Sequence, residues 1–386
     1  MRQIPIDTMK GKVITTCILS AAINASAGNM MNYRGVVYDV GLQFNEGQYS
    51  VDSFNAEAVK YDMSIISNIL RCNAVRIEGE DIDRLKQATV LAHDAGLKVF
   101  FNPWLMGAEA DEVVAYMSEA AKTAEELAKQ GIDLTFITGC EFSLFNKGVF
   151  EGNTINERLN SMMTGMANCN GDLEKLKQNK EECDKRLNAV LARISKAVKE
   201  NFSGKVAYSS GTWEGVDWSL FDIVGVDYYR DKQTDQEYLD GLKPYLAIGK
   251  PVWVMEVGCC TFEGAAALGG GGFTVCLGVD ENGEGIYAGG EKPKRSEREQ
   301  ADYDERQIRL LCGSGIEGMF IYLFSFPISP YREKGYDADL TAYPIVRSYP
   351  SDDARSHKLP AWEPKEAFYR IAQTYSEIER LSVSGN

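Results

Sequence analysis

Short runs of apolar, β-branched or aromatic residues recur along the chain, and a longer stretch with helical periodicity follows each of them. Such runs are typical of buried strands, whereas apolar residues three or four positions apart, with charged residues between them, are typical of helices packed on a sheet. The predicted strands are residues 35–42, 74–79, 98–104, 134–142, 205–210, 223–229, 251–259 and 318–326. The predicted helices include residues 81–95, 108–130, 172–201, 234–248 and 295–313, with 362–378 as a closing helix.

Eight alternating strand–helix units in about 350 residues are the signature of an α/β fold of the (β/α)8, or TIM barrel, type. Five glycines just before strands, where a helix cap or turn needs positive φ, support this division: Gly96, Gly131, Gly204, Gly249 and Gly315. No linker or low-complexity tract interrupts the pattern, so we expect a single barrel domain over residues 28–386.

Long loops are expected after strands 7 and 8, over residues 260–294 and 329–360. The first contains four consecutive glycines at positions 269–272. This run lacks the Lys-Ser/Thr of a phosphate-binding loop and opens no predicted helix, so a flexible lid over the barrel is the favoured interpretation.

Charge and composition exclude several classes of function. The 386 residues include 41 basic and 56 acidic side chains, for a net charge of −15, which disfavours binding to nucleic acid or to an anionic membrane surface. With only two histidines and no CxxC pair, histidine metal clusters, zinc sites and Ser–His–Asp triads are disfavoured. We therefore expect no metal and no cofactor.

The first 27 residues have some features of a signal peptide. Basic residues precede an apolar run at 13–23, and Ala25-Ser26-Ala27 resembles a cleavage site, although the run is too short to span a bilayer. A secreted or periplasmic protein is one interpretation, and a cytoplasmic protein with an N-terminal extension is the other. In an oxidising compartment the pairs Cys169/Cys183 and Cys260/Cys276 are candidate disulfides, but several cysteines fall in strand-like runs, where a buried free thiol is the commoner outcome.

Two predicted strands carry a glutamate near their carboxyl ends, which is where barrel enzymes hold their active sites. Strand 4 ends at Glu141 and strand 7 delivers Glu256. Simple alternation along strand 7 places Val252, Val254 and Glu256 on one face and points the residues between them, Trp253 and Met255, toward the helices. A carboxylate among apolar neighbours is costly unless it is paired or opens into a polar cleft, so two of them favour a functional site.

Paired carboxyl groups across a barrel mouth suit glycoside hydrolysis, in which one protonates the leaving oxygen and the other attacks the anomeric carbon. The sequence resembles clan A glycoside hydrolases, the retaining (β/α)8 superfamily. The resemblance implies that Glu141 is the acid/base and Glu256 the nucleophile. It also implies that Arg76, in Asn73-Ala-Val-Arg-Ile, supports the nucleophile and that Tyr229, in Asp227-Tyr-Tyr, donates a hydrogen bond to it. An oligo- or polysaccharide is then the expected partner.

The sequence departs from the clan in three places. Cys140 replaces the asparagine that usually precedes the acid/base, Asp227 replaces a histidine often found before the strand-6 tyrosine, and no tryptophan ends strand 8. A thiol is a weak hydrogen-bond partner, so recognition of the sugar is expected to differ from the clan's usual pattern.

Further residues are expected at the mouth of the barrel, each with an ordinary structural alternative. Trp104 and Trp213 are candidates to stack on sugar rings, or else they cap the core. Asn102, Glu214 and Asp227 are candidates to bind hydroxyl groups, or else they are solvated polar residues. Asp39, at the end of strand 1, is expected to face the same cavity.

A second resemblance rests on four short segments: Tyr38-Asp-Val-Gly, Gly139-Cys-Glu-Phe-Ser-Leu, Gly211-Thr-Trp-Glu-Gly-Val-Asp-Trp and Gly258-Cys-Cys-Thr. They are similar to proteins labelled abortive phage infection proteins, a label that implies no reaction. Two hypotheses therefore stand. One is a retaining glycosidase, and the other is a non-catalytic barrel for carbohydrate recognition or phage defence. The oligomeric state is not encoded in any pattern we recognise.

Overall fold

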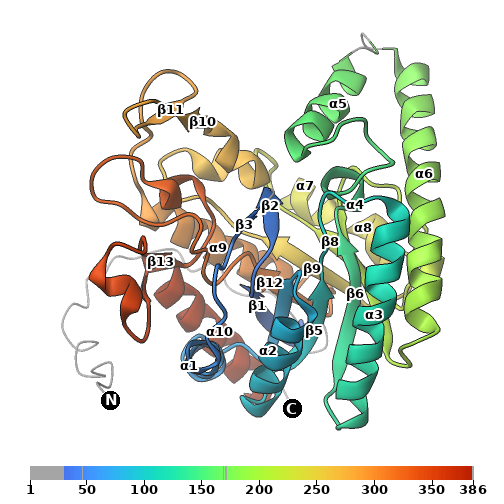
Figure 1. Ribbon diagram of the computed structural model, residues 1–386, viewed down its shortest axis with the longest axis horizontal. Helices are drawn as coiled ribbons and strands as arrows, with labels where there is room; N and C mark the ends of the chain where they lie inside the picture. The colour runs from blue at the N-terminus through green and yellow to red at the C-terminus, as the bar shows by residue number, and fades with distance from the viewer. Residues whose placement is uncertain (1–29, 46, 168, 170–171, 385–386) are drawn as a thin grey trace.

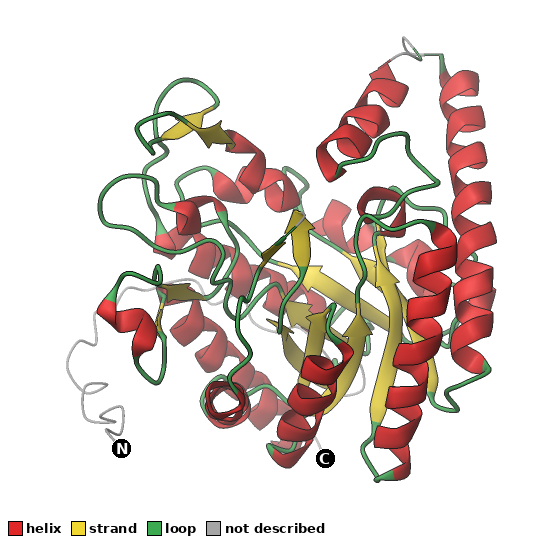
Figure 2. Ribbon diagram, viewed as in Figure 1, coloured by secondary structure: helices red, strands yellow, loops and turns green. Residues whose placement is uncertain are grey.

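A closed parallel barrel forms the centre of the molecule (Figure 2). The computed structural model describes residues 30–45, 47–167, 169 and 172–384. The barrel order is β1-β12-β9-β8-β7-β6-β5-β4. Its strands are β1 Tyr33–Asp39, β4 Ala74–Gly79, β5 Lys98–Pro103, β6 Leu134–Cys140, β7 Lys205–Gly211, β8 Ile223–Asp227, β9 Val252–Val257 and β12 Gly318–Ile321. Each of the eight predicted runs overlaps one of these strands, so the predicted (β/α)8 fold is confirmed.

Helices surround the barrel, and small two-stranded sheets lie in its connections. The helices are α1 Ala56–Asn68, α2 Ile82–Asp94, α3 Ala110–Lys129, α4 Phe142–Phe145, α5 Ile155–Ala167, α6 Leu173–Lys199, α7 Asp235–Asp240, α8 Lys243–Leu246, α9 Glu297–Cys312 and α10 Glu366–Ser384. The small strands are β2 Gln43–Asn45, β3 Gln48–Tyr49, β10 Cys276–Val279, β11 Gly285–Tyr287, β13 Val346–Ser348 and β14 Trp362–Pro364.

Some helix boundaries differ from the prediction for local reasons. The segment 234–248 forms two short helices, because α7 ends at Gly241 and Pro244 occupies the first turn of α8. The closing segment begins as strand β14, and its helix starts only after Pro364. Of the five glycines expected at positive φ, Gly204 alone does not adopt it.

The barrel interior is filled by a cluster to which every barrel strand contributes, including Phe100, Trp253, Met255 and Phe320. The Trp253 ring lies 4.3 Å from the Phe100 ring and 5.3 Å from the Phe320 ring, centroid to centroid. Val254 instead belongs to the outer layer between strands and helices. The predicted faces of strand 7 are therefore wrong, because Trp253 and Met255 point inward and not toward the helices.

A β-bulge in β9 explains how Glu256 nevertheless reaches the interior. Val226 pairs with Val254 but Asp227 pairs with Glu256, and the pairing with β12 shifts over the same residues. The extra residue on β9 breaks the alternation that runs from Val252 to Val254. Strand β6 has a similar shift, since Ile137 pairs with Ala207 but Cys140 pairs with Ser209, and Gly139 has φ 127° there. Both bulges lie next to the predicted catalytic glutamates.

Long connections extend beyond the carboxyl ends of the strands. Figure 1 shows α5 and the first half of α6 rising past the barrel on one side and the β10–β11 hairpin on the other. The sequence predicted the connections after strands 7 and 8, but it did not predict α5, which follows strand 4.

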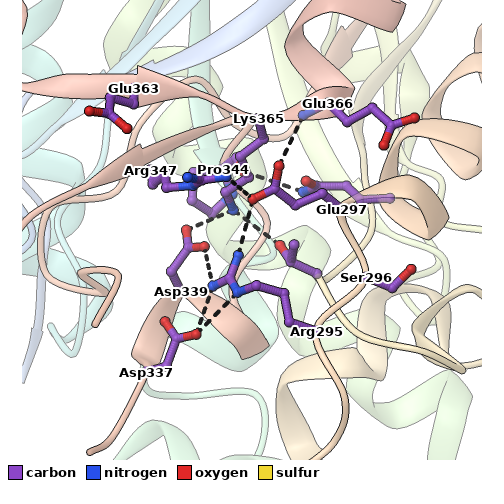
Figure 3. Close-up of polar contacts among 12 residues, drawn as sticks. Arg295, Ser296, Glu297, Asp337, Asp339, Pro344, Arg347, Glu363, Lys365 and Glu366 are labelled. Carbon is purple, nitrogen blue, oxygen red and sulfur yellow. Dashed lines mark hydrogen bonds and ion pairs between the residues drawn. The ribbon is translucent and has the colours of Figure 1, made fainter. Parts of the chain in front are cut away.

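A buried ionic network fixes the connections after β9 and β12 (Figure 3). One Arg295 nitrogen lies 2.8 Å from carboxylate oxygens of both Asp337 and Asp339. Lys365, just before α10, is fully buried, with its ammonium 2.7 Å from Asp339 and 3.0 Å from the Thr261 hydroxyl. Burial lowers the pKa of Lys365, and the neighbouring Asp339 opposes that shift. The network joins both long connections to the start of the last helix.

The cysteines of the described residues are all free thiols, so neither candidate disulfide is formed. No helix among the described residues is long and apolar enough to cross a membrane. The predicted signal-peptide or extension segment, residues 1–27, lies outside the described residues, as does Cys17.

Candidate active site

Glu256 lies at the end of β9, with its side chain held from two sides. The Arg76 guanidinium on β4 donates a hydrogen bond of 3.0 Å to its Oε1. The Tyr229 hydroxyl donates one of 2.9 Å to its Oε2. The side chain of Glu256 is 9% exposed, so one small part of this buried carboxylate faces solvent. The structure thus brings together the three residues that the sequence linked at the barrel mouth.

Arg76 is completely buried and is the cation at the centre of the site. Its Nε donates to Asn102 Oδ1 at 2.8 Å, its Nη2 lies 3.3 Å from Glu78, and its Nη1 lies 3.9 Å from Asp227. A guanidinium has five N–H donors in a fixed plane, so its position is set by several partners at once. Asn102 orients Arg76 from inside the protein and has no exposed surface for a hydroxyl group.

Cys140 and Asp227 lie beside Glu256. The Cys140 sulfur is 3.4 Å from a carboxylate oxygen of each, and the Ser209 hydroxyl donates to Asp227 at 2.7 Å. The thiol that replaces the clan's asparagine therefore points at the candidate nucleophile.

Cys140, Asp227 and Glu256 are also the one set of side chains in the described residues with the spacing of metal ligands. Their ligand atoms lie within 4.8 Å of one another. Arg76 already places a positive charge 3.0 Å from Glu256 and 3.9 Å from Asp227, where a metal ion would have to compete with it. The donor set is a poor fit for a resident metal, because only three ligands converge and a guanidinium neutralises them.

Glu141 follows β6 in a left-handed backbone conformation, with φ 44°. This conformation is costly for a residue with a side chain and persists only where the surroundings enforce it. Here the next two residues are held by hydrogen bonds: Phe142 N–H donates to the Tyr208 hydroxyl at 2.8 Å, and Ser143 N–H donates to Glu214 at 3.0 Å.

Glu214 completes this support. Its Oε1 also accepts the Ser143 hydroxyl at 2.6 Å, and its Oε2 accepts the Tyr208 hydroxyl at 2.8 Å. The sequence suggested that Glu214 binds substrate hydroxyls, but its carboxylate is buried and already bonded. We therefore interpret Glu214 as a positioning residue for the turn that contains Glu141.

Electrostatics separates the two candidate catalytic glutamates. Burial, followed by repulsion from Asp227, Glu256 and Glu214, raises the pKa of Glu141 well above that of an ordinary glutamate. Glu256, in contrast, has Arg76 and Tyr229 as donors to its charged form. A carboxyl group with a raised pKa near a second carboxyl group that accepts two hydrogen bonds is an arrangement that suits acid-assisted nucleophilic chemistry.

Two further carboxyl groups line the same region. Burial raises the pKa of Glu78 well above the usual range, although Arg76 opposes the shift. Burial likewise raises the pKa of Asp39 to about 6, against hydrogen bonds from Ser50 and Gly41. One oxygen of Asp39 and both oxygens of Glu78 accept no hydrogen bond within the described part of the chain.

The two candidate sugar-stacking residues, Trp104 and Trp213, differ in their exposure and in their contacts. Trp104 is 2% exposed and packs edge-on against Phe145 with centroids 4.9 Å apart, so it caps the core. Its indole N–H has no acceptor in the described residues. Trp213 is partly exposed and donates its indole N–H to the Ser143 hydroxyl at 3.0 Å. Trp213 is therefore the better placed of the two to contact a ligand.

The glycine run after β9 forms a 3-10 helix, Gly269–Val275, packed beside Tyr229. A Cβ at Gly270 would lie 3.0 Å from the Tyr229 ring, and the Tyr343 hydroxyl donates to Gly270 O at 2.6 Å. The prediction of a flexible lid did not include this contact. Gly270 packs closely against Tyr229, which donates a hydrogen bond to Glu256, and only a residue as small as glycine fits there without displacing the ring.

Sequence reasoning missed Glu78, Tyr208 and Ser209. Glu78 had a usable signal, since it lies two residues after Arg76 on one strand and thus on the same face. Tyr208 and Ser209 point to opposite faces of β7, and nothing in the local sequence indicates which carboxylate each one binds.

Known proteins resemble this chain in structure but not in sequence. No protein-family model matches it, and no curated protein matches it. The resemblance to abortive phage infection proteins therefore has no support from these comparisons.

Similar solved structures are glycoside hydrolases. A GH113 β-1,4-mannanase superposes with a TM-score of 0.52 at 13% identity, covering 90% of this chain and 99% of that chain. The GH113 β-mannanase from Alicyclobacillus acidocaldarius gives 0.50 at 15% identity, covering 92% and 100%. A β-glucosidase gives 0.51 at 10% identity, covering 89% and 98%. At such identities the likeness establishes a shared fold, the barrel found in these glycoside hydrolases.

Proposed function

We propose that this protein is a retaining glycoside hydrolase acting on an oligo- or polysaccharide, with Glu256 as nucleophile and Glu141 as acid/base. The observation that carries the proposal is the pair of hydrogen bonds that Arg76 and Tyr229 donate to the Glu256 carboxylate. A protein that only binds sugar has no need to orient a buried carboxylate in this way.

The proposed reaction has two displacements. First, a Glu256 oxygen bonds to the anomeric carbon while the glycosidic C–O bond breaks and Glu141 gives its proton to the leaving oxygen. Then Glu141, now a carboxylate, takes a proton from water, whose oxygen attacks the anomeric carbon and releases Glu256. The raised pKa of Glu141 supports its first role, because it retains the proton until the leaving group needs it.

Neutral sugars are the proposed substrates. Glu78, Asp227 and Glu256 surround one cation, Arg76, whose donors are largely occupied by protein acceptors. A carboxylate-bearing sugar would meet this acidic site without a free partner.

A panel of aryl glycosides, tested with wild type, Glu256→Ala and Glu141→Ala, checks the assignment. We expect Glu256→Ala to abolish hydrolysis, and added azide to give that variant a glycosyl azide of inverted configuration. With Glu141→Ala, azide is expected to give a product of retained configuration. Full activity in either variant would refute the roles. A protein inactive on aryl glycosides and on polysaccharides would refute the enzyme and favour carbohydrate recognition.

A further inference from the structure

A cavity of about 630 Å³ lies between α5, α6 and the connections that follow β6 and β7. Its size is that of a site for a small organic ligand. Neither Glu141 nor Glu256 lines it, so it is separate from the reacting centre. Its wall does include Ser143, Trp213 and Glu214, the residues that support the turn containing Glu141.

The lining is mainly apolar. Val149, Phe150, Met162, Leu173 and Leu187 contribute to it from both helices and from the β6 connection. Leu173 is 77% exposed, so the first turn of α6 presents an apolar side chain to water. The cavity therefore offers a mostly apolar wall to a ligand.

Each of the three cations that line the cavity has a carboxylate partner on α6. Lys180 lies 2.7 Å from Asp184, and Arg186 lies 3.7 Å from Glu182. Lys177, the remaining cation of the lining, lies 3.9 Å from Glu181. Charge complementarity therefore favours a neutral occupant.

We propose that this cavity binds an apolar alkyl or aryl aglycone, on the leaving-group side of the scissile bond. This inference rests on the proposed function. The acid/base of a glycosidase stands beside the leaving group, and the cavity adjoins the Glu141 turn through Ser143 and Glu214. Trp213, partly exposed in the wall of the cavity, supplies an aromatic face to the ligand there.

Gly165 provides a test, because a Cβ built there meets no atom within 4 Å while the residue lines the cavity from α5. Gly165→Leu is expected to fill part of the space and to favour the helix. The matched control is Thr164→Leu, an exposed neighbour that does not line the cavity. Leu173→Asp is a second test variant, which places a charge on the wall at an exposed position.

The first measurement is binding of the neutral fluorophore N-phenyl-1-naphthylamine to each protein. We expect wild type and Thr164→Leu to bind it equally and Gly165→Leu and Leu173→Asp to bind at least about fivefold more weakly, since each buried methylene contributes roughly a fourfold gain in affinity. Equal binding by all four proteins would overturn the proposal. Circular dichroism confirms that each variant is folded.

The second measurement is kcat/KM for the methyl and n-octyl glycosides of the sugar found with the aryl panel. We expect wild type to prefer the octyl glycoside by about tenfold or more, and Gly165→Leu, but not Thr164→Leu, to lose that preference. Hydrolysis of both at equal rates would overturn the aglycone site while leaving the proposed function intact. A third outcome is that wild type binds the fluorophore, Gly165→Leu does not, and wild type hydrolyses no glycoside. That result would overturn both the proposed function and the assignment of the cavity to an aglycone.

Discussion

Replacement of Glu214 tests whether the turn after β6 sets the position of Glu141. Glu214→Ala removes the acceptor of the three hydrogen bonds from Ser143 N–H, the Ser143 hydroxyl and the Tyr208 hydroxyl. The hydroxyls can turn toward other partners, but the buried N–H cannot. From about 1–3 kcal/mol for the orphaned N–H and about 1 kcal/mol for each hydroxyl, we expect a loss of about 3–5 kcal/mol in the free energy of unfolding. Glu214→Gln keeps an oxygen for Ser143 and is expected to lose about 1 kcal/mol.

The kinetic consequence distinguishes a misplaced acid from a protein that is merely less stable. A 2,4-dinitrophenyl glycoside has a leaving group that departs without a proton, whereas an alkyl glycoside needs one. General acid catalysis contributes about 10²–10⁴-fold, so we expect Glu214→Ala to lower kcat/KM by about 10–100-fold on the alkyl glycoside and by less than about threefold on the dinitrophenyl one. Urea unfolding gives the stabilities, and Glu214→Gln is the control. Equal losses on both substrates would refute the positioning role.

Three further predictions concern single residues. Tyr229→Phe removes the hydrogen bond to Glu256 and is expected to cost about 1.5–3 kcal/mol, or about 10–100-fold in kcat/KM, and an unchanged value would contradict it. Gly270→Ala is expected to displace the Tyr229 ring and so to lower kcat/KM. The double variant with Tyr229→Phe is expected to lose no more activity than Tyr229→Phe alone. Additive losses would show that Gly270 does not act through Tyr229. Burial raises the pKa of Asp62 to about 7, although a hydrogen bond from Trp362 opposes the shift. Between about pH 4 and pH 7 the folded protein therefore binds a proton at Asp62 that the unfolded chain has released. The free energy of unfolding is therefore expected to fall as pH rises from about 4 to 7, by up to about 1.4 kcal/mol per pH unit. Asp62→Asn is expected to reduce this slope in urea titrations at several pH values. The same slope in wild type and variant would refute the role of Asp62.

The barrel was predictable because each of its strands is a compact apolar run followed by a turn and an amphipathic helix. The positions of Glu141 and Glu256 followed from the same pattern, since both residues end such a run. Arg76 and Tyr229 were found through resemblance, and the structure places both within hydrogen-bond distance of Glu256. Their roles in catalysis remain predictions.

The faces of the strands were not predictable to the same degree. A bulge adds one residue to a strand relative to its neighbours, and the register of neighbours roughly 30 to 70 positions away is invisible in a local pattern. Trp253 was therefore assigned to the wrong face. The hydrogen bond between Ser143 and Glu214 was unpredictable for the same reason. The two residues are 71 positions apart, so their contact depends on how the strands are arranged. The cavity beside α5 depends likewise on a helix whose pattern we did not recognise.

The last residues of the chain hold parts of its beginning and middle, and this has a consequence for synthesis. Strand β1 pairs with β12, the Trp362 indole donates to Asp62 across 300 positions, and Tyr375 donates to Gly35 O. Lys365 completes the network between the two long connections only when the final helix is present. A nascent chain that has not yet formed β12 therefore has open sheet edges at β1 and β9, because β12 pairs with both strands. A chain that contains β12 but lacks residues 362–384 would have all eight barrel strands without the contacts of Trp362, Lys365 and Tyr375.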